Sequence, residues 1–168
     1  MANFNFLAIL IAAIVSLVIG FIWYNPKVFG NAWLKSIKHD PNDTNRPNMG
    51  LFIGLSFVLA LPLGLILHFI TIHQFGFTSL LGATNDLTKM EPELRGHVEY
   101  FFNNYSDDFR TFKHGAFHGF IMGLMFVTPI IAINSIYEKR SFKYIAISAG
   151  YWIVTLTIMG SIICGWVK

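Results

Sequence analysis

Charged residues are scarce in this sequence. Only 12% of the 168 residues are Asp, Glu, Lys or Arg, whereas a soluble domain carries roughly 25%. The charges gather in three short segments and leave four long stretches almost free of them. This composition excludes an ordinary soluble globular fold, and each apolar stretch is typical of a helix that crosses a lipid bilayer.

Cysteine and the common catalytic motifs are also nearly missing. The one cysteine, Cys164, lies in an apolar stretch, so an internal disulfide is excluded and a small packing residue is expected. The sequence has no glycine-rich phosphate loop, no Gly-x-Ser-x-Gly elbow and no Cys-x-x-Cys pair. The net charge of +3 is not accompanied by a basic run with interleaved aromatics, which argues against nucleic-acid binding. These absences favour a role without catalysis.

The four apolar stretches predict an all-α fold, a bundle of four transmembrane helices forming one integral membrane domain over residues 1–168. The predicted helices span residues 4–24, 49–72, 107–136 and 144–167. Each is long enough to cross a hydrocarbon layer of about 30 Å. Because the first stretch lacks a basic leader and ends in Trp-Tyr, it is predicted to be a membrane helix and not a cleaved signal.

Two connecting segments predict short amphipathic surface helices, in loops one and two. In the first loop, apolar residues gather on one helical face between positions 28 and 37. In the polar loop of residues 73–113, the capping-box pattern Thr88-Lys-Met-Glu91 precedes apolar residues at helical spacing and predicts a helix over residues 89–105. Ser106-Asp-Asp is then the expected N-terminal cap and first turn of the third membrane helix.

Small residues recur every four positions in three of the predicted helices. Such stripes let a second backbone approach closely, which favours tight helix packing; the alternative is that they line a pore. The three stripes are Gly115, Gly119 and Gly123; Ala8, Ala12, Ser16 and Gly20; and Ser56, Ala60 and Gly64. Trp23, Tyr24 and Trp33 are expected to anchor the chain at the membrane–water interface.

Four histidines mark the candidate functional site. His114 and His118 stand four residues apart in the third predicted helix, and His68 and His73 lie at the end of the second. Because loop two joins these helices, the four imidazoles are expected at similar depth on one side of the membrane. Histidine is costly in a membrane helix, and a four-residue step presents two ring nitrogens on one face, as helical metal sites do.

This histidine cluster predicts a site for a transition metal, a haem or another small ligand, or a proton relay. The alternative is that the histidines are interfacial residues that bond to carbonyl groups, lipid phosphates or neighbouring helices. His97 and the acidic residues of loop two are further possible ligands on the same side.

The distribution of basic residues predicts the orientation. Loops one and three hold seven Lys and Arg residues, whereas the other side holds five over a longer stretch. The positive-inside rule then places loops one and three in the cytoplasm of a cell whose inner membrane holds the protein. Both termini and loop 73–113 are expected on the outer side.

Several phrases of the sequence resemble a known family. They are Gly20-Phe-Ile-Trp-Tyr-Asn-Pro-Lys-Val-Phe-Gly-Asn-Ala-Trp33, Phe112-Lys-His-Gly-Ala-Phe-His-Gly119, Asn134-Ser-Ile-Tyr-Glu-Lys-Arg-Ser141, Gly150-Tyr-Trp152 and Met159-Gly160. Over nearly the whole chain, the sequence resembles the small bacterial membrane proteins grouped as domain of unknown function seventeen-sixty-one. The resemblance implies a four-helix membrane fold and supplies no activity.

Three functions are compatible with these observations. The first is a non-enzymatic scaffold or accessory subunit, which contacts the lipid bilayer and copies of itself or other membrane subunits. The second is a binder of a metal, a haem or a small ligand through the histidines. The third is an oligomeric pore or small transporter, suggested by Pro62, Pro129 and Asn134 within the predicted helices.

Overall fold

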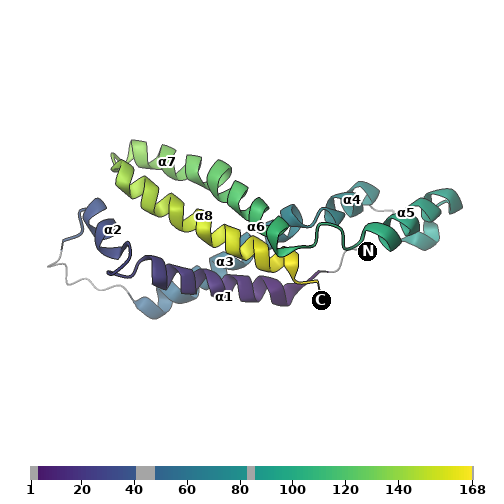
Figure 1. The fold of residues 1–168 in the computed structure, drawn as a ribbon, viewed down its shortest axis with the longest axis horizontal. Coiled ribbons are helices and arrows are strands. Elements are labelled where there is room, and N and C mark those ends of the chain that lie inside the picture. The colour runs from purple at the N-terminus through teal and green to yellow at the C-terminus, as the bar shows by residue number, and fades with distance from the viewer. Residues whose placement is uncertain (1–3, 41–47, 83–85, 168) are drawn as a thin grey trace.

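The structure, a computed structural model, describes residues 4–40, 48–82 and 86–167. Over these residues the fold is all-α, as predicted, and four helices are long and apolar enough to cross a membrane (Figure 1). They are α1 (Phe6–Trp23), α3 (Met49–Thr71), a composite helix (Phe112–Tyr137) and α8 (Phe142–Gly165). Arg46 and Lys168, two of the basic residues counted above, lie outside the described residues.

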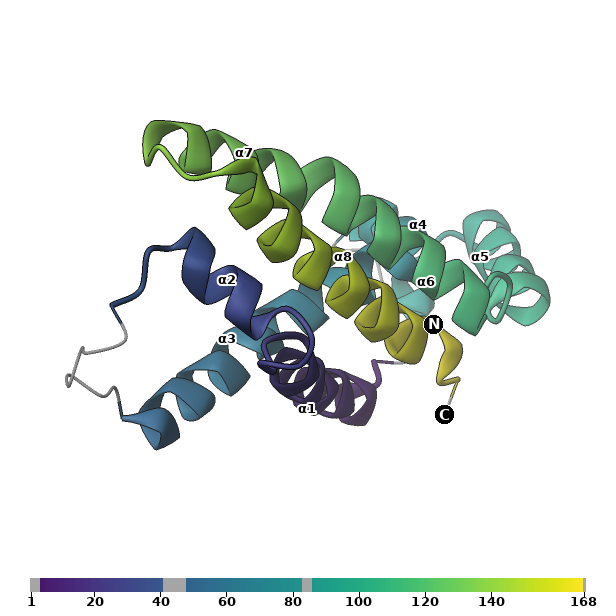
Figure 2. The ribbon, with the colours of Figure 1, turned by 60° about the vertical axis from the view of Figure 1, so that its left-hand side comes forward.

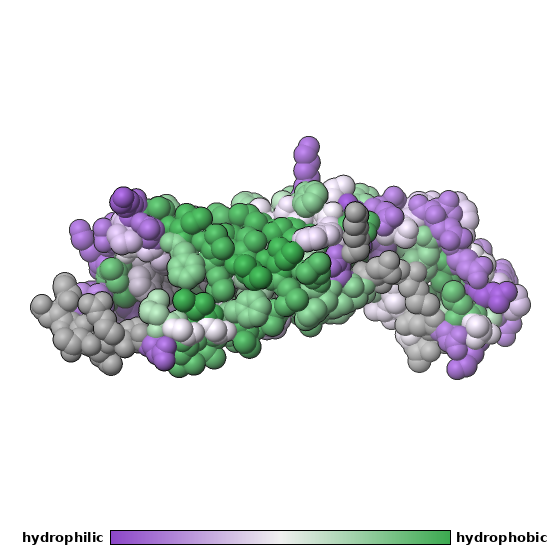
Figure 3. All heavy atoms as spheres, turned by 90° about the horizontal axis from the view of Figure 1, so that it is seen from below, coloured by the Kyte–Doolittle hydropathy of each residue, from purple (hydrophilic) through white to green (hydrophobic). Residues whose placement is uncertain are grey.

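Shorter helices lie at the two ends of this bundle. α2 (Gly30–Ser36) lies at the same end as the turn between α7 and α8, whereas α4 (Gln74–Leu81) and α5 (Pro92–Tyr105) lie at the opposite end, with the start of α1 and the end of α8 (Figure 1). On the face seen in Figure 3, the surface between the two ends is mostly apolar, and hydrophilic residues gather at both ends. This banding is what a protein embedded in lipid requires.

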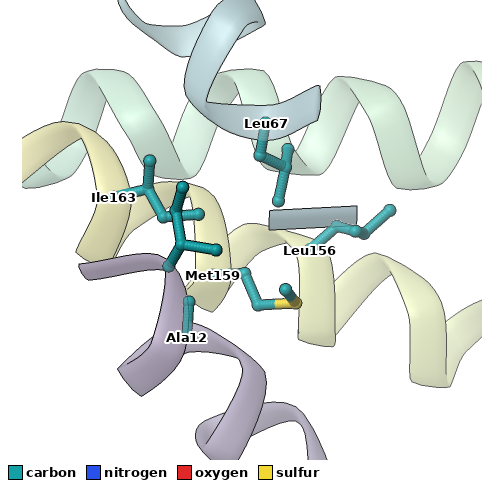
Figure 4. Packing of buried hydrophobic residues seen from close by; sticks show 6 residues of the cluster. Ala12, Leu67, Leu156, Met159 and Ile163 are labelled. Atoms are coloured by element: carbon teal, nitrogen blue, oxygen red, sulfur yellow. The ribbon is translucent and has the colours of Figure 1, made fainter. Parts of the chain in front are cut away.

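The interior is built around α8. Half of its apolar span is buried, whereas the other three spans bury between 11% and 28% of theirs. Where α1, α3 and α8 meet, their side chains form one closely packed cluster (Figure 4). Its buried members are Ile9, Ala12, Leu67, Leu156, Met159 and Ile163. Because lipid tails are as apolar as these side chains, close packing is what favours helix contact over lipid contact.

The glycines of the composite helix lie directly against the backbone of α8. A Cβ atom at Gly119 would lie 2.6 Å from the carbonyl carbon of Leu156, and one at Gly123 would lie 2.6 Å from Cα of Ile153. At Gly115 a Cβ would collide with the backbone of Gly160. Backbone atoms cannot rotate away as side chains do, so this contact requires glycine.

The stripes of α1 and α3 lie where these helices meet each other and α8. Ala8, Ala12 and Ser16 are buried, and a Cβ at Gly64 would lie 2.9 Å from Cγ2 of Ile9 on α1. Ser56 is exposed, so the α3 stripe leaves the packed interface toward its N-terminal end.

The composite helix contains a π-helical segment. It consists of α6 (Phe112–Ile121), the π-helical segment Met122–Val127 and α7 (Thr128–Tyr137). Pro129 cannot donate a backbone hydrogen bond, and a wider turn before it relieves the clash of its ring with the preceding turn. The Thr128 hydroxyl donates to the Gly123 carbonyl oxygen at 2.8 Å and satisfies one acceptor in this segment.

The predicted start of this helix at Asp107 is wrong. Residues 107–111 form a turn in which Phe109 has a φ of +62°, a left-handed conformation that interrupts a helix. Ser106 ends α5, and the N-cap of α6 is Thr111, whose hydroxyl oxygen accepts from the backbone N–H of His114 at 3.1 Å. The two aspartates therefore belong to a tight connection between helices.

The predicted capping box at Thr88 is also wrong. Thr88 lies in a single 3₁₀ turn (Leu87–Lys89), and Asp86 caps that turn by accepting from the Thr88 backbone N–H. Hydrogen bonds from Thr88 and Lys89 hold the pKa of the Asp86 carboxyl below its usual value. α5 begins only at Pro92, a residue that suits the first helical position because its missing N–H would be unpaired there. α4 was not predicted from the sequence.

The segment after α1 folds back onto the bundle. The Trp23 indole N–H donates to the Ile147 carbonyl oxygen of α8 at 3.1 Å, and the ring of Tyr24 packs against that of Trp33 in α2 at 5.3 Å between centroids. A Cβ at Gly30 would lie 2.8 Å from the carbonyl carbon of Asn25, so the turn requires glycine. The three aromatic residues thus hold α2 against the ends of α1 and α8.

Tyr24 is a neutral residue of this junction. Burial raises the pKa of its hydroxyl to about 12, and the neighbouring Tyr151 and Tyr144 add to the rise.

Replacing Gly119 by Ala tests the close approach of α6 to α8. We expect a loss of about 1–3 kcal/mol in stability, because the added methyl group would overlap α8 backbone atoms. Thermal unfolding in a mild detergent measures it. The matched control is Gly54→Ala on α3, where no atom of the described residues lies within 4 Å of the added Cβ. Equal melting temperatures for the two variants would contradict the packing described.

Candidate metal centre

Three of the four predicted histidines come together at the end of the bundle that carries α4 and α5. One ring nitrogen from each of His73, His114 and His118 lies within 4.8 Å of those of the other two. Nε2 of His114 and Nε2 of His73 are 2.9 Å apart, a hydrogen bond in which one nitrogen donates and the other accepts, according to the tautomers. The ring centroids are 4.5–5.0 Å apart.

Two of these side chains come from one face of α6. His114 and His118 are one helical turn apart, which places both rings on the same side of the helix. Each directly precedes a glycine of the stripe, Gly115 or Gly119, that packs against α8. The glycine contact therefore fixes the position of α6 along α8 and its rotation about its own axis. Both imidazoles project from α6 beside the surface that contacts α8.

The third side chain comes from the junction between α3 and α4. α3 ends at Thr71, and His73 is the N-cap residue of α4. Its neighbour Gln74 is buried, and the side-chain amide of Gln74 donates to the carbonyl oxygens of Tyr105 and Asp108 at 2.8 and 2.9 Å. This amide clamps the turn before α6 onto the start of α4, and so sets the distance between His73 and the α6 pair.

The turn that carries Phe109 lies beside the cluster. Its left-handed φ is unusual for a bulky residue, and its ring lies 5.4 Å from that of His114 and 6.2 Å from that of His73. The next residue, Arg110, is buried and donates from Nε to the Cys164 carbonyl oxygen of α8 at 3.0 Å. The strained turn is thus tied to α8 on one side and to Gln74 on the other.

The geometry fits a small transition-metal ion. Zinc binds imidazole nitrogens at about 2.0–2.1 Å, so two ligands of a tetrahedral site stand roughly 3.4 Å apart. The three nitrogens, all within 4.8 Å of one another, reach that arrangement by side-chain adjustments of about 1 Å. Three histidines leave a fourth position open to water or another ligand, as in catalytic zinc sites.

The same geometry does not fit a haem held between two histidines. Axial imidazoles bind the iron from opposite faces of the porphyrin and need a wide flat slot between them. Here the three rings converge, and the Nε2 atoms of His73 and His114 are in hydrogen-bond contact. Of the two cofactors considered from the sequence, the metal ion is the one that these residues suit.

His68 lies apart from the other three histidines. It is fully buried and packs edge-on against Phe4 and at a tilt against Phe75, with ring centroids 4.7 Å away in both cases. Among the described residues neither ring nitrogen has a hydrogen-bond partner. His97 and the acidic residues of loop two that the structure describes are likewise not members of the cluster.

Two residues that position the site were not singled out from the sequence. Gln74 follows a predicted ligand directly, but no pattern indicates that its amide reaches a segment more than thirty residues away. Phe109 falls within the helix predicted over residues 107–136, where no sequence pattern indicates a left-handed turn. Both act through the turn at 107–111, which the sequence did not reveal.

The fold and its apolar surface define a class: an integral membrane protein with four candidate membrane-spanning helices. Within that class, the chain belongs to the family described as protein of unknown function (DUF1761), whose model matches residues 7–164. No curated protein and no solved structure matches it.

Replacing Gln74 by Leu tests the clamp between α4 and the turn before α6. Losing two hydrogen bonds to backbone carbonyls should cost about 2 kcal/mol locally, roughly a 30-fold rise in local opening. Hydrogen–deuterium exchange over residues 105–112 measures it, and the helices should keep their protection. Ser79→Ala, which removes an exposed bond within α4, is the control; unchanged exchange in Gln74→Leu would exclude the clamp.

Proposed function

We propose that this protein binds a transition-metal ion in the membrane boundary through His73, His114 and His118. The observation that carries the proposal is the convergence of three imidazole nitrogens within 4.8 Å. Bringing three histidines together at the end of apolar helices is costly unless something binds them. A metal ion does so by accepting one lone pair from each ring.

The surroundings of the three rings support exchange of the ion with water. His73 is exposed, while His114 and His118 are partly buried on α6. The pair on α6 is held by the contact with α8, and His73 is the N-cap residue of α4, a helix at one end of the bundle (Figure 1). An ion can therefore enter past His73 and bind His114 and His118, which α6 already holds on one face.

A zinc or cobalt titration of the purified protein tests this function. We expect one ion per chain, and Co²⁺ should give the visible absorption of a tetrahedral nitrogen site. His73→Ala, His114→Ala and His118→Ala should each lower the affinity by at least roughly 100-fold. Affinity should also fall in acid, because protons compete for the same lone pairs.

The control for this titration is His97→Ala, which removes an exposed histidine of α5 that lies outside the cluster. It should bind the ion as the unaltered protein does. If the three cluster variants bind as tightly as His97→Ala, the proposed function is wrong.

A second candidate function is that of a scaffold or accessory subunit in a homo-oligomer or a larger bacterial membrane complex. The composite helix supports it, because only 11% of its apolar span is buried within the chain. Large apolar side chains such as Met125, Phe126 and Ile133 are more than half exposed along it. Such a face meets either lipid or another membrane helix.

We further propose that α4 and α5 lie on the outer side of the inner membrane and α2 on the cytoplasmic side. The support is the excess of basic residues around α2 and the α7–α8 turn. In this orientation the histidine centre meets the outer compartment.

Single cysteines test this orientation. A membrane-impermeant maleimide added to intact cells should label Lys89→Cys and should leave Lys35→Cys unlabelled until the cells are opened. Both positions are exposed, and the native Cys164 is buried, so background labelling is low. Labelling of Lys35→Cys on intact cells, without Lys89→Cys, would reverse the assignment.

A further inference from the structure

A cleft lies between α1, α3 and α8 in the half of the bundle nearest α2. Its volume is about 470 Å³, within the size range of small-molecule sites. Most of its lining is apolar, and its polar groups include Ser16, Ser56 and Tyr151. Phe52 and Leu59 on the α3 wall are 50% and 65% exposed, so the cleft is open to its surroundings.

The position of the cleft determines what can fill it. Its walls belong mostly to the candidate membrane-spanning helices α1, α3 and α8, so in a bilayer most of its opening would face hydrocarbon. An empty space of this size would leave the lining atoms without dispersion contacts. A flexible hydrocarbon chain is the occupant that the surroundings supply and that an apolar lining accepts.

The end of the cleft meets a cluster of positive charge. Tyr24 lines the cleft and packs against Trp33 of α2. The described residues at this end of the bundle include six basic residues, Lys27, Lys35, Lys38, Lys139, Arg140 and Lys143, against two acidic residues, Asp40 and Glu138. Three of the lysines are exposed on the segment that contains α2. Basic residues at a membrane surface attract anionic lipid headgroups.

We propose that this cleft binds one acyl chain of an anionic phospholipid, whose headgroup phosphate is held by Lys27, Lys35 and Lys38. The hydrocarbon part is recognised by the apolar walls and the phosphate by the excess positive charge next to α2. This site is separate from the histidine centre, because none of the three histidines lines the cleft. The cleft lies in the half of the bundle nearest α2, and α2 and α4 lie at opposite ends of the bundle (Figure 2).

Native mass spectrometry with defined lipids tests the site. The probes are phosphatidylglycerol and phosphatidylcholine with identical acyl chains, which share hydrocarbon and differ in charge. We expect one retained phosphatidylglycerol per chain and a preference of roughly tenfold over phosphatidylcholine. Equal retention of the two lipids by the unaltered protein would overturn the proposal.

Two kinds of variant separate the chain-binding and headgroup-binding parts. Ser56→Trp fills the cleft and should abolish the retained lipid, whereas Val58→Trp, on an exposed face of α3 outside the cleft, should not. Replacing Lys27, Lys35 and Lys38 by Gln should remove the preference for phosphatidylglycerol and leave weak binding of both lipids. Because those lysines are exposed, the triple variant should fold, and it tests the headgroup site even where Ser56→Trp does not fold.

Two results would contradict the proposal. One is a Ser56→Trp protein that folds and retains phosphatidylglycerol as before. The other is a dimer that survives in Val58→Trp and is lost in Ser56→Trp, since the cleft would then hold a helix of a second copy.

Discussion

The constraint on which the candidate site depends is the backbone contact between α6 and α8. Gly115 and Gly119 meet Gly160 and Leu156 so closely that no side chain fits between the two helices. In a membrane such a contact is stabilised by dispersion over a long shared surface, because lipid competes for every apolar face. It also fixes the rotation of α6 about its axis. His114 and His118, each one residue before a glycine, are therefore directed away from α8 and toward the α3–α4 junction.

The sequence predicted the features that repeat along a helix. The lengths of the apolar stretches gave the four candidate membrane helices, whose ends mostly fall within two residues of those expected. The four-residue steps of glycine and histidine depend only on helix geometry and are visible in the sequence. The sequence does not show which helix packs against each stripe, because a smooth helix face does not identify its partner surface.

The features that escaped prediction depend on contacts between distant segments. The turn at 107–111 looks like the capped start of a helix, and only the bonds of Gln74 to Tyr105 and Asp108 and of Arg110 to Cys164 explain why it is not one. The separation of His68 from the other histidines has the same origin. His73 lies beyond the end of α3, whereas His68 lies inside it and packs against Phe4 and Phe75.

The way in which the three histidines are held has a consequence for metal binding. His114 and His118 belong to a helix that is fixed to the bundle, but His73 belongs to the junction that leads to α4 and depends on the Gln74 clamp. An ion bound by all three would join α4 and α5 to the membrane bundle through bonds much stronger than a single hydrogen bond. Its release would leave the hydrogen bond between His73 and His114, and the bonds of Arg110 to the carbonyl oxygens of Cys164 and Trp166, among the polar links that the described residues make between this segment and the bundle. The proposed site therefore suits a protein in which metal occupancy changes how firmly α4 is held to the bundle, since His73 is the N-cap residue of α4.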